Sequence, residues 1–402
     1  MNVLYISYDG ALDPLGHSQV IPYLERLSAL GHRFDLVTFE KPSRFADQGI
    51  RLPIAQRLAT AGIRWHPLRY HKRVSPVATS YDLARGSLKV RRLAQARDFD
   101  LVHARSYPSA LLAWQLSRRV GVPFVFDMRG LYPAERVDGG LWPAGGALFR
   151  ATTALERRFL RDAAAVVTLT RASLPTVQQM VADAGGVAPV EVIPTCVDLA
   201  HFQPAEAPAA PFVLAYAGSI GTWYLLEEML RFGAAVLEYA EGRMLFLVNG
   251  SPEPVRSCAR AAGLAIDRLD VRTVKHHEVP AAIGVASATC AFIRATRAGI
   301  ARAPTKLSES LALGLPAAVN RGIGDAADIV EREGVGVVVD PFDASSFPGA
   351  ARQLVDLARD PSVRRRCRAV ATRLFDLDAG VRRYGELYEA AARSRRSPAG
   401  RR

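Results

Sequence analysis

The sequence predicts an α/β protein with two Rossmann-like domains, each built on a parallel sheet, that face a central cleft. The chain has 402 residues, and a domain commonly has about 100–200, so two domains are expected. Short apolar runs alternate with segments of helical periodicity, and this alternation occurs twice along the chain. Prolines and small residues at 204–211 interrupt the periodicity between the two series and are interpreted as a linker.

The expected N-terminal domain, residues 1–203, begins with a strand, a loop, a helix and a second strand. A helix between two strands is the crossover that parallel strands require. These first segments are VLYIS, YDGALDPLGHSQ, VIPYLERLSALGH and RFDLVTF. The alternation then continues through DLVHAR, YPSALLAWQLSRR, PFVFDMR, GALFRATTALERRFLRDA, AAVVTLT and VEVIPT.

The expected C-terminal domain, residues 212–375, repeats the same alternation. Its segments are FVLAYAGS, LLEEMLRFGAAVLEYA, RMLFLVNGS, PEPVRSCARAAG, LDVRTV, EVPAAIGVA, ATCAFIRA, APTKLSESLALG, LPAAVN and GVGVVVD. The helix in APTKLSESLALG is expected to have Pro304 at its first position, Thr305 as an acceptor for free amides, and Gly314 as its left-handed end. The tail RRYGELYEAAARSRRSPAGRR is predicted to form one amphipathic helix with a basic, frayed end.

Composition excludes several classes of protein. Hydrophobic residues make up 49% and charged residues 23%, as in globular proteins. No apolar run approaches the roughly 20 residues of a membrane span, and MNVLYISYDG lacks the features of a signal peptide, so a cytoplasmic protein is expected. Neither half has G-x-G-x-x-G after its first strand, which argues against a nicotinamide or flavin enzyme.

No metal site made of protein ligands is expected. The cysteines lie far apart and lack the paired spacing of zinc or redox sites, and the two neighbouring histidines point to different sides of their element. These residues are Cys196, Cys258, Cys290, Cys367, His276 and His277.

The net charge of +13 is concentrated in one part of the chain. From Arg51 to Arg97 there are eleven Lys or Arg residues and one acid, Asp82, with Trp65, Tyr70 and Tyr81 between them. This basic segment could contact nucleic acid, anionic lipid headgroups or a phosphorylated acceptor. It could also be an ordinary solvated surface.

Ligands of open parallel sheets bind beyond the carboxyl ends of the strands, so the loops there contain the candidate residues. In the N-terminal domain these are Gly16 and His17 in the first loop, and His103, Asp127 and Arg129 after two later strands. Alternatives stay open, because Gly16 could form a tight turn, His103 could be a satisfied core histidine, and Asp127 could cap a turn.

In the C-terminal domain, the segment from Arg294 to Glu309 is the most informative. Arg294, Arg302 and Lys306 precede or begin a helix, and cations together with free backbone amides favour a pyrophosphate. Glu309 is suited to accept hydrogen bonds from sugar hydroxyls. The alternative is that Lys306 and Glu309 only solvate a surface helix. Further donor-binding candidates in this domain are Gly218, Ser219, Asn249 and Leu307.

Four motifs in this order resemble glycosyltransferase family 4, which has the GT-B fold. They are GHRFDLVTF, VIPTCVDLAHFQP, LAYAGSIG and PTKLSESLALGLPAAVNRGIGDAADIV. The resemblance implies retaining transfer of a hexose-type sugar from a nucleotide diphosphate donor on the C-terminal domain. The acceptor would be a glycan, a lipid-linked compound or a small molecule, in cell-surface polysaccharide or glycolipid synthesis. It also implies that a final helix, residues 376–394, packs back on the N-terminal domain.

The resemblance assigns roles to several residues and exposes two departures. Glu309 matches the second of a pair of glutamates, near the nucleotide ribose, while Ala301 stands where the first would be. A basic pair common in the family is absent from GSIGTWYLLEE, which leaves phosphate neutralisation to Arg294, Arg302 or Lys306. Arg129 occupies the region of an active-site histidine in many relatives.

The leading hypothesis is therefore a cytoplasmic glycosyltransferase, peripheral on the inner face of a membrane through Arg51 to Arg97, with no tightly bound metal and no nucleic-acid partner. One rival is a catalytically inactive GT-B scaffold that binds nucleic acid or anionic surfaces, which the basic segment and Ala301 motivate. A second rival is an epimerase or phosphorylase of the same fold.

Overall fold

The computed structural model describes residues 1–71, 75–204, 211–221, 223–248, 250–274, 278–343 and 345–394. The chain forms two compact units, Met1–Ile193 together with the chain from Leu377 onward, and Pro194–Asp376. The second unit thus begins earlier than the expected linker at 204–211, of which 205–210 lie outside the described residues. The reason is packing, because Val197 pairs with Asp376 and Phe202 lies in the core of the second unit.

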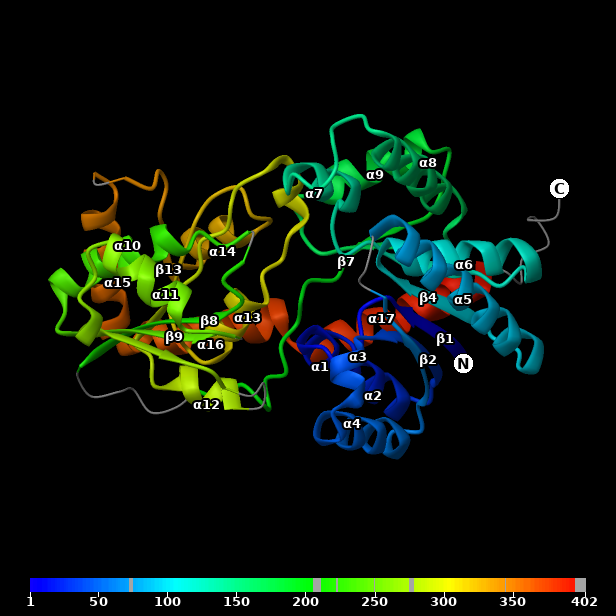
Figure 1. Cartoon of the computed structure of the whole chain (residues 1–402), viewed down its shortest axis with the longest axis horizontal. Coiled ribbons are helices and arrows are strands. Elements are labelled where there is room, and N and C mark those ends of the chain that lie inside the picture. Colours follow the sequence, from blue (N-terminus) through cyan, green and yellow to red (C-terminus); the bar gives the residue numbers. More distant parts are fainter. Residues whose placement is uncertain are drawn as a thin grey trace. The chain divides into compact units, whose positions relative to one another are not determined.

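The first unit contains a seven-stranded parallel sheet in the order β3-β2-β1-β4-β5-β6-β7 (Figure 1). Its strands are β1 Asn2–Ser7, β2 Arg33–Glu40, β3 Arg64–Arg69, β4 Leu101–Arg105, β5 Phe124–Asp127, β6 Ala165–Thr168 and β7 Val190–Val192. The apolar runs predicted all of these strands except β3. That edge strand is only half-buried and contains Pro67, which edge strands tolerate, so it lacks an apolar pattern.

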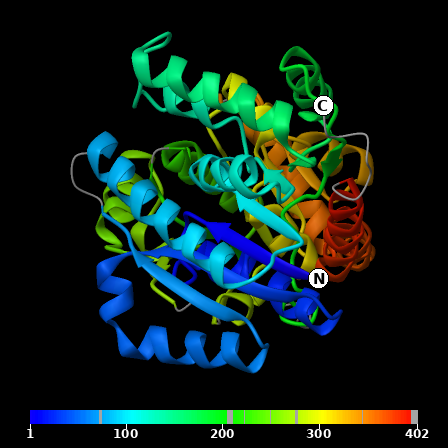
Figure 2. The ribbon, with the colours of Figure 1, turned by 90° about the vertical axis from the view of Figure 1, so that its right-hand side faces the viewer.

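Helices cover both faces of this sheet. They are α1 Pro14–Gln19, α2 Ile21–Ala29, α3 Pro42–Ala46, α4 Gln48–Thr60, α5 Ser75–Ala96, α6 Ser106–Val120, α7 Tyr132–Asp138, α8 Ala147–Asp162, α9 Leu174–Asp183 and α17 Leu377–Ser394. Figure 2 shows α4 and α5, in darker and lighter blue, on opposite sides of the strands. The expected basic segment is therefore divided between two faces of the domain.

The first loop of the chain differs from the prediction. Residues 14–19 were expected to be loop and instead form α1, with Pro14 at its start. Proline at a first helical position is preorganised for the helix, and Gly16 lets this short helix pack closely on its own loop.

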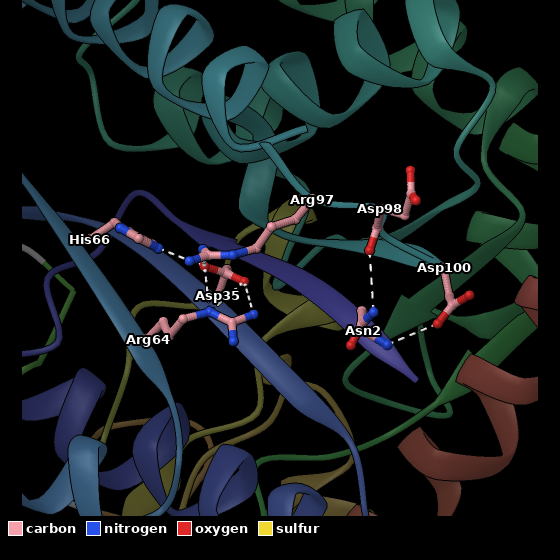
Figure 3. A network of polar contacts seen from close by, with 7 residues as sticks. All are labelled: Asn2, Asp35, Arg64, His66, Arg97, Asp98 and Asp100. Carbon is pink, nitrogen blue, oxygen red and sulfur yellow. Dashed lines mark hydrogen bonds and ion pairs between the residues drawn. The ribbon is translucent and has the colours of Figure 1, made fainter. Parts of the chain in front are cut away.

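At the amino edge of the sheet, Asp35 of β2 collects three basic side chains (Figure 3). Its fully buried carboxylate lies 2.6 Å from Arg64 Nη2, 2.8 Å from Arg97 Nη1 and 2.7 Å from His66 Nε2. In the same region, the Asn2 backbone amide donates to Asp100. These contacts join β2, β3 and the chain after α5 at the edge opposite the candidate site.

The second unit contains a six-stranded parallel sheet in the order β10-β9-β8-β11-β12-β13. Its strands are β8 Phe212–Gly218, β9 Gly242–Val248, β10 Leu269–Arg272, β11 Ala288–Cys290, β12 Ala317–Val319 and β13 Gly336–Val338. Its helices are α10 Leu226–Tyr239, α11 Glu253–Ala261, α12 Val279–Gly284, α13 Thr305–Ala312, α14 Ala326–Glu333, α15 Phe347–Arg359 and α16 Pro361–Phe375, with 3-10 turns at Ile266–Arg268 and Arg297–Ala301. Two apolar clusters fill the two faces. The predicted class of two Rossmann-like parallel-sheet domains is confirmed.

The C-terminal end of α13 agrees with the prediction, whereas its N-terminal end differs. Gly314 has φ +76° and follows the helix in the left-handed region, as expected. Pro304 is the residue before the helix and not its first member, and no side chain caps the amides there. Free amides therefore remain at the beginning of α13.

The last helix, α17, belongs to the first unit, as the resemblance implied. It packs against α2, β4 and β5, and it buries Tyr384 and Tyr388 against the sheet. No helix in the described ranges is both long and apolar enough to span a membrane.

Candidate active site

Each sheet has a point at which the strand order reverses. In the first unit the chain runs outward from β1 to β3 and resumes at β4 on the other side of β1; in the second, β8 and β11 stand in the same relation. Ligands of such sheets bind at the carboxyl ends of the strands that flank this point. Residues that bind a ligand are therefore expected at this point in each unit.

In the second unit a pocket lies at this point. It is lined by the ends of β8, β11 and β12 and by α13, including Ala217, Ala291, Lys306, Glu309 and Asn320. Most of its lining is apolar, so the few polar groups can fix the orientation of a ligand.

Glu309 contributes the one carboxylate of this pocket's lining. Burial raises its pKa to about 7, and the charge of Lys306 opposes that rise. No hydrogen bond to its side chain is formed by the residues that the structure describes. A desolvated carboxylate of this kind is an acceptor for ligand hydroxyl groups.

Lys306 lies next to Glu309 in the same pocket and is held by aromatic side chains. Its Nζ donates to Tyr224 Oη at 2.7 Å and lies 4.1 Å from the centroid of the Tyr224 ring. Gly218, with φ +146°, makes room for it, because a Cβ there would lie 2.6 Å from Nζ. The structure thus brings together Gly218, Lys306 and Glu309, as the sequence predicted.

The other predicted donor-binding residues differ in their exposure and in their contacts. The Arg302 guanidinium stacks over Trp223 at 3.8 Å, Arg294 and Ser219 are exposed, and Leu307 both lines the pocket and packs in the core. Asn249 lies outside the described residues. Ala301 is 1% exposed, so a carboxylate at this position would be buried.

Three further residues belong to this site: Tyr224 and Asn320, which lie in two of the loops expected to hold ligand-binding residues, and Tyr216, which was not predicted. Asn320 is buried and accepts from the Ile293 amide at 2.8 Å while donating to the Ile293 carbonyl at 2.9 Å, which ties the ends of β11 and β12 together. Tyr216 and Tyr224 surround Lys306. An asparagine directly after an apolar strand was the available signal for Asn320, whereas the tyrosines reach Lys306 only through tertiary packing.

In the first unit, the predicted catalytic residues His103, Asp127 and Arg129 lie together beneath α17. Asp127 Oδ2 is 3.5 Å from His103 Nε2 and 3.8 Å from Arg129 Nη1. It also accepts a hydrogen bond from Tyr384 at 3.2 Å. Burial acts to raise the pKa of Asp127, but the charge of Arg129 and the neighbouring His103 outweigh it, so this pKa is lowered.

His103 is enclosed on all sides of its ring. It stacks on Tyr5 at 4.2 Å, its Nδ1 is 2.8 Å from Tyr388 Oη, and it is 1% exposed. Burial lowers the pKa of His103, against the effect of Asp127. This environment is that of a core histidine, the alternative that the sequence left open.

Arg129 and Ser106 have strained backbones at the carboxyl ends of two adjacent strands. Their φ angles are +60° and +68°, in the left-handed region that residues other than glycine rarely adopt. Strain of this kind gathers at functional sites, where the surrounding structure maintains it. Among His103, Asp127 and Arg129, Arg129 is therefore the residue whose backbone conformation indicates a functional role.

Gly16 and His17 lie on α1, beside the loop that follows β1. A Cβ on Gly16 would lie 2.4 Å from the Gly10 carbonyl oxygen, so the close backbone approach is made by the protein's own chain. Glu40, which was not among the predicted residues, holds this loop by accepting from the amides of Ala11 at 2.8 Å and Leu12 at 3.2 Å.

No group of three or more His, Cys, Asp or Glu side chains within the described ranges is placed to hold a metal ion. Metal independence stays a prediction.

Comparison with known proteins finds one family match, in the N-terminal part of the chain. Residues 20–196, less than half of the chain, match the glycosyl transferase 4-like domain. The chain as a whole shares its two-domain fold with solved glycosyltransferases. No curated protein matches the chain by sequence.

Solved structures resemble this chain over nearly its full length. Sucrose-phosphate synthase from Thermosynechococcus elongatus is 16% identical with a TM-score of 0.74, covering 98% of this chain and 100% of that one. A glycosyltransferase from Rickettsia africae is 13% identical with a TM-score of 0.69, covering 97% and 98%. HepE from Anabaena, in complex with UDP and glucose, is 13% identical with a TM-score of 0.66, covering 97% and 100%. At these identities the likeness shows the shared fold.

Proposed function

We propose that the protein transfers a hexose-type sugar, with retention of anomeric configuration, from a nucleoside diphosphate donor to an acceptor on the N-terminal domain. The observation that carries the proposal is the pocket at the carboxyl ends of β8, β11 and β12, with Lys306 and Glu309 side by side. A ligand with phosphates and adjacent hydroxyls complements these groups. The fold of HepE, which was solved with UDP and glucose, supports the same class of donor.

The proposed chemistry depends on charge that develops on the donor. As the bond to the leaving phosphate breaks, negative charge grows on the diphosphate and positive charge on the sugar. Lys306, fixed by Tyr224, and Arg302, stacked on Trp223, are preorganised cations that would stabilise that phosphate charge. The leaving phosphate can then take the acceptor's proton on the same face, which retains the configuration without a protein nucleophile.

The test of the donor site is Glu309→Gln, with Glu331→Gln as its matched control. Glu331 lies on α14, is exposed, and pairs with Arg321. Loss of a charge-assisted hydrogen bond weakens binding by roughly 1.5–3 kcal/mol, so UDP affinity and sugar transfer should fall about tenfold to a hundredfold. Lys306→Ala should weaken UDP more than UMP, because its proposed partner is a phosphate that UMP lacks. Equal UDP binding by the Glu309 and Glu331 variants would leave the donor assignment without support.

The acceptor in this proposal is a glycan, a lipid-linked compound or a small molecule of cell-surface polysaccharide or glycolipid synthesis. The enzyme would work in the cytoplasm, on the inner face of a membrane. Within the basic segment, Arg57, Arg64 and Arg97 are engaged by Glu25 or Asp35. The exposed cations of α5 are then the better candidates for an anionic surface; they are Arg85, Arg91 and Arg92. Sedimentation with anionic vesicles should decrease with salt and be absent with neutral vesicles.

Catalysis is expected to need no tightly bound metal, and transfer measured after chelation checks this. Transfer that chelation abolishes and magnesium or manganese restores would contradict it. A melting temperature that rises with oligonucleotides but not with nucleoside diphosphates would instead favour the inactive scaffold.

A further inference from the structure

A second pocket lies in the first unit, at the carboxyl ends of β2 and β3. Its lining combines apolar side chains with two arginines at the rim. The residues are Glu40, Pro42, Phe45, Ala46, Arg51, Pro67, Leu68 and Arg69. Arg51 and Arg69 belong to the basic segment, and Glu40 also binds the first loop.

The apolar part of the pocket is built from α3 and β3. Phe45 packs on Trp65 at 6.3 Å between ring centroids, and Trp65 is anchored by its Nε1 donating to Thr38 Oγ1 at 2.8 Å. Prolines at both ends, Pro42 and Pro67, carry no backbone donor to be satisfied. This part of the pocket therefore suits an apolar chain.

The rim has cations that the protein leaves available. Arg51 lies over the Phe45 ring at 4.9 Å, and Arg69 is exposed. No carboxylate pairs with either arginine among the described residues. The two nearby acids are engaged elsewhere, because Glu40 accepts from the amides of Ala11 and Leu12, and Asp47 caps α4 through Gly49 and Ile50.

The place of the pocket relates it to the expected site of transfer. β3 is two strands from β1, and strands are about 4.8 Å apart, so the pocket is roughly 10 Å from the switch point of this sheet. The loop between them, Gly10–Leu12, is held by Glu40. A ligand in the pocket could therefore present a hydroxyl group near the end of β1.

We propose that this pocket binds the acceptor, and that the acceptor is an anionic amphiphile whose apolar chain contacts Phe45 and Leu68 and whose phosphate is held by Arg51 and Arg69. Two arginines match a phosphate because their planar donors form paired hydrogen bonds with its oxygens. The inference deepens the proposed function and rests on it, since it names the class of acceptor. The phosphate could belong to a membrane lipid or to a soluble amphiphile.

The test is calorimetric binding to the full-length protein with octyl phosphate as the probe, compared with octanol and inorganic phosphate. Octyl phosphate should bind about tenfold more tightly than octanol or inorganic phosphate. Arg51→Ala and Arg69→Ala should each weaken it about tenfold, and Phe45→Ala should weaken octyl phosphate without changing UDP binding. The matched control is Arg57→Ala, which removes the same charge from α4 outside this pocket and should leave binding unchanged.

The results that would overturn this acceptor pocket differ from those that would overturn the donor site. Octyl phosphate that binds the Arg51 and Arg69 variants as it binds the native chain would overturn the proposal, even where Glu309→Gln still weakens UDP. Equal affinity for octanol and octyl phosphate would overturn it too. Binding of octyl phosphate that depends on Arg51 and Arg69 supports the pocket whether or not UDP binds. If only the Arg51 and Arg69 variants lose binding to anionic vesicles, the phosphate belongs to a membrane lipid. If the protein binds octyl phosphate but not the vesicles, the phosphate belongs to a free amphiphile.

Discussion

Asp35 is a single residue on which the amino edge of the N-terminal sheet depends. Its carboxylate is fully buried and hydrogen-bonded to Arg64 and His66 of the adjacent strand β3 and to Arg97 of the chain after α5 (Figure 3). Desolvation acts to raise its pKa, yet the bonds to His66 and Arg64 and the charges of Arg64 and Arg97 hold that pKa well below its usual range. The ionised form is therefore the one that the fold stabilises.

We expect Asp35→Asn to lower the free energy of unfolding by about 2 kcal/mol at pH 7, measured by urea denaturation. The arginines are 41% exposed and can turn to water, which limits the loss. A depressed pKa stabilises the fold above the unfolded value, about 3.9, and the benefit disappears as pH falls below it. The difference between native and variant should thus stay constant from pH 7 to pH 5 and shrink below about pH 4. A difference that persists unchanged at pH 3.5 would contradict this account.

The pKa of Glu309 shifts upward, in the opposite direction to that of Asp35. Because burial raises its pKa from 4.5 to about 7, the folded chain without ligand binds more protons than the unfolded chain between those values. Stability should fall as pH rises through this window. Glu309→Gln should therefore raise the free energy of unfolding at pH 8 by about 1 kcal/mol and have little effect at pH 4.5, although the same change weakens UDP binding. UDP affinity of the native enzyme should rise through pH 7, and that of the variant should not.

At the scale of elements, α17 is the cover of the buried cluster in the first unit. Tyr388 is fully buried and its Oη lies 2.8 Å from His103 Nδ1, while Tyr384 donates to Asp127. Without the hydroxyl of Tyr388, the Nδ1 atom of His103 would stay buried and unsatisfied. We expect Tyr388→Phe to cost about 1–3 kcal/mol of unfolding free energy and Tyr388→Ala more, because a cavity is added. Tyr239→Phe is the control, since Tyr239 is 40% exposed on α10 and should show no change.

At the scale of the whole molecule, the two units differ in how the chain forms them. The second unit is one continuous segment, Pro194–Asp376, whereas the first needs α17 from beyond that segment. We expect a fragment of residues 194–376 to unfold cooperatively and to bind UDP. A fragment of residues 1–193 should lack cooperative unfolding, because it would expose the cluster of His103 and Asp127, and adding residues 377–394 through a flexible linker should restore it. Cooperative melting of residues 1–193 alone, followed by circular dichroism, would show that α17 is dispensable.

Local patterns in the sequence were enough for the class of fold and for one part of the proposed donor site. Buried parallel strands are apolar runs, so every strand but the half-exposed β3 was predictable. Lys306 and Glu309 could be paired from the sequence because three residues along a helix lie on one face. Gly314 was predictable as the end of α13 for an equally local reason, its left-handed backbone.

Tertiary structure alone decided which distant residues meet. Tyr224 positions Lys306, Asn320 ties together two strand ends, and Tyr388 encloses His103, each across a long stretch of chain. The basic segment shows the same limit: its excess of charge was visible in the sequence, but Glu25 and Asp35, which neutralise part of it, lie outside the segment. Periodicity records which face of an element is buried, while the partners on that face are determined by the order of strands and the helices that cover them.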